Sequence, residues 1–201
     1  MIVPDLVRLP LSFDAAALAA EALALGAEDW VPHFNRDIYE GEWGGVALRS
    51  VGGVATQLYP DPAAQAPFAD TETLDRCPEL RRALDQFHCP LLAARLLVLA
   101  PGAVINEHRD YRLGWADGEI RVHIAVVTSP DVEFVLDGRR VELAAGQAWY
   151  LNLSLPHRVA NRSAVNRIHL VVDCVVDDWL RGAMAEAVQT GSESVDSPPA
   201  C

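Results

Sequence analysis

The second half of the chain, from Ala94 onward, is a series of short strand-like runs separated by turns, and this pattern constrains the fold more than any other feature. The turns carry Pro-Gly, Asp-Gly and Ala-Gly pairs, which favour tight reversals of the chain. Asp137-Gly138 directly follows the run 132–136 and is the sequence signal of a two-residue turn in a tight β-hairpin. The runs span residues 95–100, 104–107, 120–127, 132–136, 140–143, 148–153 and 166–176. Seven short strands between such turns indicate a sandwich or a barrel.

Two helices are expected before residue 94. Asp14 is a suitable N-cap for the first, whose apolar residues recur at helical spacing until Gly26. Pro78 fits the first position of the second helix, which must end before Pro90.

The remaining segments complete a single domain of ordinary size. Residues 46–49 alternate like a short strand, and the Pro- and Ala-rich segment 60–70 is expected to form a loop. The expected domain covers residues 1–189, and its order is a helical or mixed part (1–93), a strand-rich core (94–176) and a closing helix (177–189), followed by a flexible tail (190–201). With 201 residues, about half of them apolar, the chain can bury a core of its own.

Composition argues against several classes of function. All sixteen basic residues are arginine, so no lysine can form a Schiff base, anchor pyridoxal phosphate or serve a phosphate loop. A net charge of −12 argues against nucleic acid and anionic membranes as partners. The four cysteines form no CxxC pair, the first residues lack a leader pattern, and the apolar run 15–27 is too short to cross a bilayer, so a cytoplasmic location is expected.

Only one of the six histidines has an acidic residue two places further on, in His108-Arg109-Asp110. On a strand, residues i and i+2 point the same way, so this imidazole and this carboxylate would converge on one metal ion. Chance alone supplies about one such pair in a chain of this composition. A surface histidine beside a solvated aspartate is the alternative.

A second imidazole comes from His157, which follows the apolar run 148–153. With His108 and Asp110 it would make a triad of two histidines and one carboxylate. Such a triad leaves three positions open on a six-coordinate metal, which suits Fe(II) oxygenases better than structural zinc with its four closed ligands. On spacing alone, a packing or capping histidine is the alternative.

Arg167 follows His157 by ten residues, on an expected strand that carries His169 on the same face. An arginine that points into a barrel needs a partner, and the carboxylate of a bound cosubstrate matches the guanidinium fork. An internal acid such as Asp173 is the alternative partner. His169 orients a ligand or, more simply, fills the core.

Arg121 and His123 repeat this arrangement on one face of the run 120–127. In the alternative arrangement they lie on the outside of the barrel, and Ile120, Val122 and Ile124 point inward. Either face of a strand can be the buried one, so alternation alone leaves both open.

Taken together, these stretches resemble a known family. From about Arg95 to Asp173 the chain resembles the aspartyl/asparaginyl β-hydroxylase-related branch of the 2-oxoglutarate-dependent oxygenases, and within it the bacterial proline cis-4-hydroxylase members. The matching stretches are His108-Arg109-Asp110-Tyr111, Ile120-Arg121-Val122-His123, residues 146–151 with 154–157, and residues 167–173. Their order and spacing are specific in combination.

The resemblance implies a mainly β fold, the double-stranded β-helix of jelly-roll or cupin type, with flanking N-terminal helices and a C-terminal helix. It implies Fe(II) bound by His108, Asp110 and His157, with O2 as a further substrate. It also implies that Arg167 binds the distal carboxylate of 2-oxoglutarate. Arg121 and His123 fall where relatives place an arginine and a histidine around this cosubstrate.

Two positions depart from the pattern of the family. The animal peptidyl hydroxylases lack the carboxylate ligand that Asp110 supplies. Leu97 stands where those relatives have a serine that binds the cosubstrate. Both departures favour the branch that acts on small substrates.

The expected function is therefore that of an Fe(II)- and 2-oxoglutarate-dependent hydroxylase acting on an unactivated C–H bond of a proline-like amino acid. The expected substrate contacts flank the metal motif: Arg109, Tyr111, Arg112 and Trp115. Three alternatives stay open: hydroxylation of an Asp, Asn or other amino acid held in a peptide or on a carrier, a cupin-like enzyme without 2-oxoglutarate, and a non-catalytic cupin-like binding module. Nothing in the sequence determines the oligomeric state.

Overall fold

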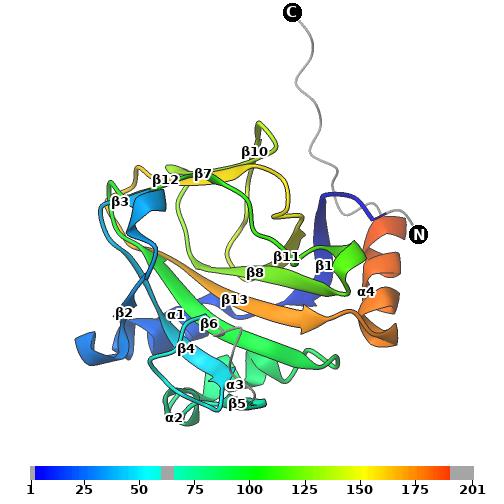
Figure 1. Ribbon diagram of the computed structural model, residues 1–201, viewed down its shortest axis with the longest axis horizontal. Coiled ribbons are helices and arrows are strands. Elements are labelled where there is room, and N and C mark those ends of the chain that lie inside the picture. The colour runs from blue at the N-terminus through cyan, green and yellow to red at the C-terminus, as the bar shows by residue number, and fades with distance from the viewer. Residues whose placement is uncertain (1–2, 60–65, 191–201) are drawn as a thin grey trace, which may run out of the picture.

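A computed structural model describes residues 3–59 and 66–190 of the chain. Two β-sheets face each other, and helices cover the outer face of the larger sheet (Figure 1). This mainly β architecture with flanking helices is the one expected from the succession of short strands.

The larger sheet has eight strands and draws on both halves of the chain. Across the sheet they are β1 (Leu6–Ser12), β11 (Gln147–Leu151), β8 (Glu119–Val127), β13 (Arg167–Val175), β6 (Leu91–Leu99), β4 (Trp43–Val51) and β2 (Val31–Pro32), with β5 (Phe68–Asp70) paired to β4. Strands that precede residue 94 thus lie in the same sheet as the strands of the expected core.

The smaller sheet has five strands. Their order is β10 (Arg139–Val141), β9 (Val132–Leu136), β12 (His157–Asn161), β7 (Val104–His108) and β3 (Tyr39–Glu40). The turn between β9 and β10 is the expected two-residue hairpin, because Leu136 pairs with Arg139. Asp137 and Gly138 have φ of 49° and 74°, the positive values that the favoured hairpin turn requires.

The four α-helices of the described residues lie against the larger sheet (Figure 1). They are α1 (Ala15–Ala24), α2 (Glu72–Asp75), α3 (Pro78–Leu84) and α4 (Asp178–Gln189), and short 3-10 helices occur at Ala27–Asp29, Arg36–Ile38 and Trp115–Asp117. The side chain of Asp14 accepts hydrogen bonds from the first turn of α1, and Pro78 begins α3. The predicted starts of these helices are therefore confirmed.

The central strands β8 and β13 are buried on both faces. Their even-numbered residues are apolar and belong to the core beneath the helices: Ile120, Val122, Ile124, Ile168, Leu170 and Val172. Their odd-numbered residues include Arg121, His123 and Arg167, which line a cavity between the sheets. The alternative that placed Arg121 and His123 on the outside of the barrel is wrong, because the helices cover the apolar face instead.

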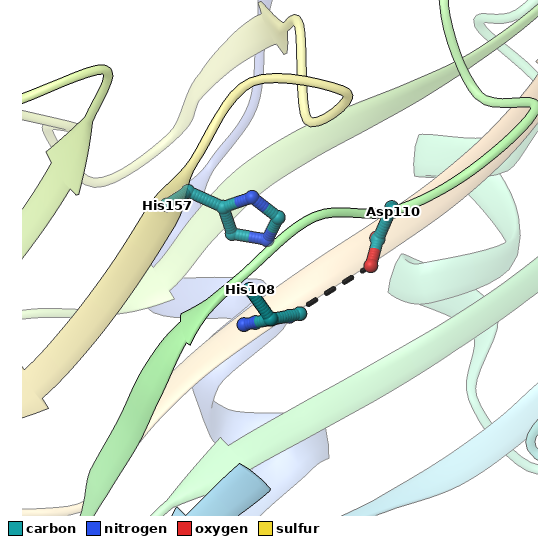
Figure 2. A group of neighbouring side chains, drawn as sticks. All are labelled: His108, Asp110 and His157. Carbon is teal, nitrogen blue, oxygen red and sulfur yellow. Dashed lines mark ion pairs between the residues drawn. The ribbon is translucent and has the colours of Figure 1, made fainter.

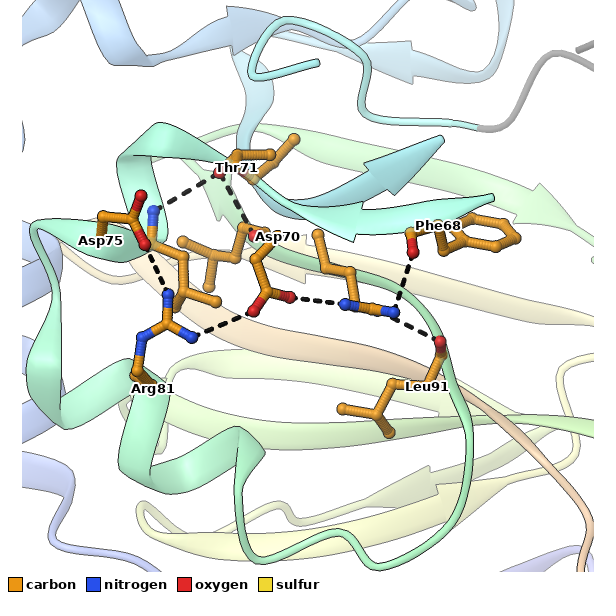
Figure 3. A network of polar contacts seen from close by, with 10 residues as sticks. Phe68, Asp70, Thr71, Asp75, Arg81 and Leu91 are labelled. Atoms are coloured by element: carbon orange, nitrogen blue, oxygen red, sulfur yellow. Dashed lines mark hydrogen bonds and ion pairs between the residues drawn. The ribbon is translucent and has the colours of Figure 1, made fainter. Parts of the chain in front are cut away.

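Two arginines connect the helical layer to the edge of the larger sheet (Figure 3). Arg49 of β4 donates to Asp70 Oδ1 at 2.6 Å and to two backbone carbonyls. Arg81 of α3 donates to the other oxygen of Asp70 at 3.0 Å and to Asp75 at 2.7 Å. Asp70 therefore links β4, β5 and α3.

Several secondary-structure expectations need correction. The loop expected over residues 60–70 is wrong for Phe68–Asp70, which forms β5, while residues 60–65 lie outside the described residues. β1 was not expected, since Pro10 interrupts its strand pattern. Most of the expected tail, from residue 191, also lies outside the described residues. Within the described part of the chain, no helix is both long and apolar enough to span a membrane.

Candidate metal centre

Three side chains expected to bind a metal converge between the two sheets (Figure 2). His108 is the last residue of β7 and His157 the first of β12, and the two residues pair across these neighbouring strands. Ligand atoms of His108, Asp110 and His157 all lie within 4.8 Å of one another. The separation between His108 Nε2 and Asp110 Oδ1 is 3.7 Å.

Asp110 reaches this cluster from a loop rather than from a strand. β7 ends at His108, so the expectation that both residues share one strand face is wrong in its geometry. The backbone N–H of Asp110 instead donates to the carbonyl of Leu153 at 2.8 Å, which fixes the loop beside the segment leading to His157. The residues converge as expected, for a different structural reason.

Both histidines present their Nε2 atoms as free ligands. The Nδ1 of His108 lies 2.8 Å from the carbonyl of Asn106, and the Nδ1 of His157 lies 3.1 Å from that of Leu155. A carbonyl only accepts, so each Nδ1 carries the proton and each Nε2 keeps its lone pair. Burial, together with the neighbouring His108, lowers the pKa of His157, which favours the neutral form that binds metal.

Arg121 holds the third ligand in place. Its Nη1 donates to Asp110 Oδ2 at 2.5 Å, while its Nε and Nη2 donate to the two oxygens of Asp173 at 2.7 and 3.1 Å. Arg121 and Asp173 are paired residues of β8 and β13, so the strand register places them together. This arrangement leaves Asp110 Oδ1, the oxygen nearer to His108, free for a metal.

Asp173 is the anionic centre of this network. Arg95 of β6 also donates to it, at 3.0 Å, and all three side chains are buried. Burial alone would raise the pKa of Asp173, but the guanidinium groups of Arg121 and Arg95 outweigh that effect and hold it at about 2. The alternative in which Asp173 pairs with Arg167 is therefore wrong.

Arg167 is a buried cation without a carboxylate partner among the described residues. Its side chain is only 3% exposed, its Nη2 contacts His169 Nδ1 at 2.8 Å, and its Nε forms no hydrogen bond in the described structure. Burial lowers the pKa of Arg167 to about 9, so the group is still charged at neutral pH. His169 is buried beside it and accepts from Arg167, which fixes its orientation.

A cavity of about 450 Å³ contains this site. It is lined by the metal triad, by Arg121, His123 and Arg167, and by Leu97, the residue that departs from the family pattern. Of the expected substrate contacts, Arg109 and Tyr111 line the cavity, whereas Arg112 and Trp115 are not among its lining residues. Trp115 packs against the main core and under the guanidinium of Arg181.

Three further residues of the site were not anticipated. His33, Tyr59 and Phe134 all line the cavity. The ring of Phe134 stacks on His157 and lies beneath the guanidinium of Arg167. The sequence signal for His33 is weak, because it is a single histidine in an aromatic-rich segment with no acidic neighbour at metal-ligand spacing.

The donor set and its surroundings fit a metal with a polar ligand beside it. Two imidazole nitrogens and one carboxylate oxygen suit Fe(II), and they leave coordination positions open. Among the described residues, every buried side-chain nitrogen without a hydrogen-bond partner belongs to one of four residues in or next to this barrel interior: Trp43, Arg95, His123 and Arg167. Buried polar atoms normally have partners, and a polar ligand in the cavity could supply acceptors for Trp43 and Arg167, which line it.

Two facing sheets with this triad and a buried arginine between them match the arrangement that the resemblance to the 2-oxoglutarate-dependent oxygenases implies. Within that class, the chain belongs to the aspartyl/asparaginyl β-hydroxylase family, whose sequence pattern matches residues 13–176.

Several individual proteins are similar to this chain. The chain is 25% identical over 165 residues to the L-proline cis-4-hydroxylase of Rhizobium meliloti (strain 1021), covering 81% of this chain and 58% of that protein, so it spans somewhat more than half the length of this relative. A 2OG-Fe(II) oxygenase family oxidoreductase from Burkholderia pseudomallei has a similar fold, with a TM-score of 0.54, 17% identity and 85% coverage of each chain. A Pseudomonas putida prolyl-4-hydroxylase matches with a TM-score of 0.48 and 18% identity, over 86% of this chain and 93% of that one.

Proposed function

We propose that this chain is an Fe(II)- and 2-oxoglutarate-dependent dioxygenase that hydroxylates an unactivated C–H bond of a small, proline-like amino acid. Family membership and the composition of the site support the reaction type. The Rhizobium meliloti relative is an L-proline cis-4-hydroxylase, which supports the substrate class.

The observation that carries this proposal is that three neighbouring donor atoms are free to bind a metal. Each imidazole donates a hydrogen bond from Nδ1 to a backbone carbonyl, and Arg121 donates a hydrogen bond to one oxygen of Asp110. The remaining donors are three atoms that face one another and have no better partner in the described structure. Three protein donors suit a catalytic metal, because a structural zinc site normally closes with four.

Each residue of the site has a role in this proposal. His108, Asp110 and His157 would hold Fe(II), and Arg167 would bind the distal carboxylate of 2-oxoglutarate through its guanidinium fork. The chemistry supplied by these groups when bound is oxidation by O2, in which one oxygen atom enters succinate as CO2 is released and the other enters the C–H bond.

Arg121 and His123 remain assigned to the surroundings of the cosubstrate. Arg121 in addition fixes the orientation of Asp110. His123 lies near Arg167, with its Nδ1 3.4 Å from His169 Nδ1 and its Nε2 without a partner in the described residues. Burial and the charge of Arg167 lower the pKa of His123, so the ring is neutral and adds no second cation beside the cosubstrate.

Anaerobic titration with Fe(II) and 2-oxoglutarate tests the proposal. We expect a weak visible charge-transfer band that requires both components, and equal yields of succinate and hydroxylated product once O2 and L-proline are added. A metal-bound protein that turns over without 2-oxoglutarate would point to another cupin-like enzyme. A protein that binds neither metal nor 2-oxoglutarate would be a binding module instead.

A second candidate is hydroxylation of an amino acid that is held in a peptide or on a carrier. Two large side chains on the wall of the cavity, Phe34 and Tyr111, are 73% and 83% exposed. Exposed aromatic residues around a cavity suit contact with a larger partner. Comparison of L-proline with a proline-containing peptide, by product formation, separates the two candidates.

A further inference from the structure

His33 lies in the wall of the same cavity, outside the metal triad, and Trp43 stacks against it. We propose that His33 and Trp43 form a subsite that binds the carboxylate of the amino-acid substrate through their ring N–H groups. This inference rests on the proposed function, because it names a contact to the substrate of that reaction.

Aromatic rings fix the position of His33. Its imidazole stacks on the Trp43 indole with 3.6 Å between ring centroids and 9° between planes. The edges of Tyr39 and Tyr59 contact it at centroid distances of 5.8 and 4.9 Å. The side chain is only 5% exposed. The ring therefore has a single orientation before any ligand binds, and preorganisation of this kind lowers the entropy cost of binding.

The hydrogen bonds of His33 determine which nitrogen carries the proton. The backbone N–H of Asn35 donates to His33 Nδ1 at 3.2 Å, so Nδ1 holds the lone pair. In the neutral ring the proton must then lie on Nε2, which forms no hydrogen bond with the described residues. Burial lowers the pKa of His33 to about 4, so the neutral ring is the form present at pH 7. The result is an unused donor in the cavity wall.

Trp43, which stacks on His33 and lines the same cavity, has a second unused donor. Its Nε1 is buried and has no hydrogen-bond partner among the described residues. Indole nitrogen is a donor only, and a buried donor without a partner costs about 1–3 kcal/mol. An acceptor oxygen of a bound ligand would satisfy it.

The charges around the cavity favour a carboxylate as that acceptor. Three arginines and one aspartate line the cavity: Arg109, Arg121, Arg167 and Asp110. The charges of Fe(II) and 2-oxoglutarate would cancel, so the wall keeps an excess of positive charge that attracts a second anion. His33 and Arg167 both line this cavity, and Arg167 is already assigned to the distal carboxylate of 2-oxoglutarate. Substrate and cosubstrate carboxylates are therefore assigned to different residues.

His33→Phe is the informative variant, because it keeps a ring to stack on Trp43 and removes the N–H group. Binding of L-proline and of its methyl ester to the anaerobic complex with Fe(II) and 2-oxoglutarate is measured by calorimetry. We expect the affinity for L-proline to fall by tenfold to a hundredfold in this variant, and the affinity for the ester to stay near its wild-type value. His33→Gln, which restores an N–H donor, should recover part of the loss.

His88→Phe is the matched control. His88 is exposed and stacks on Trp179, with 5.5 Å between centroids and 15° between planes, and it is not among the residues that line the cavity. This variant should bind L-proline as the wild type does. Trp43→Phe keeps a ring and removes the second donor, so it should weaken L-proline binding but not ester binding.

Four outcomes would overturn the subsite. The first is that folded His33→Phe binds L-proline as tightly as the wild type does, and the second is that the wild type binds L-proline and its ester equally well. The third is that His33→Phe loses affinity for 2-oxoglutarate and not for L-proline. The fourth is that the wild type binds neither probe. The last outcome also removes the amino-acid substrate but leaves the oxygenase assignment intact if the charge-transfer band forms. If no band forms, the proposed function fails, and the subsite fails with it because it rests on that function.

Discussion

Arg121 and Arg167 are both buried between the sheets, but only Arg121 of the two has carboxylate partners among the described residues. Arg121 donates to Asp110 and Asp173, whereas Arg167 has no carboxylate partner among the described residues. An uncompensated buried charge is strongly destabilising unless a ligand completes it. The contrast distinguishes an arginine that organises the protein from one that is available to an anion.

Replacement of Arg167 by lysine keeps the charge and removes the fork. We expect the KM for 2-oxoglutarate to rise by one or two decades, corresponding to about 1.5–3 kcal/mol for a hydrogen bond to a charged group. Iron affinity should hardly change. Steady-state kinetics in 2-oxoglutarate, with a thermal melt of the same preparation, checks this. An unaltered KM in folded protein would end the cosubstrate assignment.

Asp110→Ala should abolish turnover while the fold stays intact. The variant loses the carboxylate ligand, but Arg121 keeps both hydrogen bonds to Asp173, which hold it in place. We expect iron content to fall by at least tenfold, as measured by metal analysis of the purified protein alongside succinate formation. His88→Ala, a histidine outside the site, should retain its iron. If Asp110→Ala is as active as the wild type, Asp110 is not a metal ligand.

At the scale of elements, each central strand serves two purposes. The even positions of β8 and β13 build the core under the helices, and the odd positions build the site. Alternation in the sequence predicts that the two sets of residues lie on opposite faces, because side chains on a strand alternate between faces. It does not predict which face the helices cover. The identity of Asp173 as the partner of Arg121 was not predictable, since the two residues are 52 positions apart and the whole sheet sets the register between their strands.

Local signals explain most of the elements that were predicted. The Asp14 cap, Pro78 and Asp137-Gly138 act within a few residues of sequence, and all three features formed as expected. β12 was missed because its sequence, His157–Asn161, is short and polar, and it becomes a strand by pairing with β7 and β9. The contact of His33 with aromatic residues from several segments depends on the tertiary fold in the same way.

The N-terminus of α3 is capped by a side chain from α1. Glu21 accepts hydrogen bonds from the backbone N–H groups of Glu79 and Leu80, each at 2.8 Å. The negative charge of Glu21 also interacts favourably with the positive end of the helix dipole. Glu21→Ala should lower the free energy of unfolding by about 1–2 kcal/mol, measured by urea denaturation. The exposed Glu186 of α4 is the control, and its alanine variant should differ from wild type by less than about 0.5 kcal/mol.

At the scale of the whole molecule, buried histidines make stability depend on pH. Burial lowers the pKa of His33 to about 4 from 6.5, and it lowers the pKa of His123, His157 and His169 as well. The unfolded chain therefore binds more protons than the folded chain below pH 6.5. The metal-free protein should lose stability as the pH falls from 6.5 towards 4, by up to about 3 kcal/mol for His33 alone.

His33→Phe separates this contribution from that of the other histidines. Urea denaturation of the metal-free variant between pH 6.5 and 4 should show a shallower pH dependence than wild type, by close to one proton. Parallel curves for the two proteins would show that His33 titrates normally in the folded state.

Some residues of the cavity wall lie on strands and others on loops, and this difference determines which of them can be changed to accept other substrates. Arg121, His123 and Arg167 share their strands with core residues, so randomising them in a library would yield mostly proteins that fail to fold. Phe34 and Tyr111 belong to connecting segments and are exposed. Diversity confined to such positions changes the shape offered to a substrate at little cost to folding. Laboratory evolution of a new specificity should therefore begin at these loop residues.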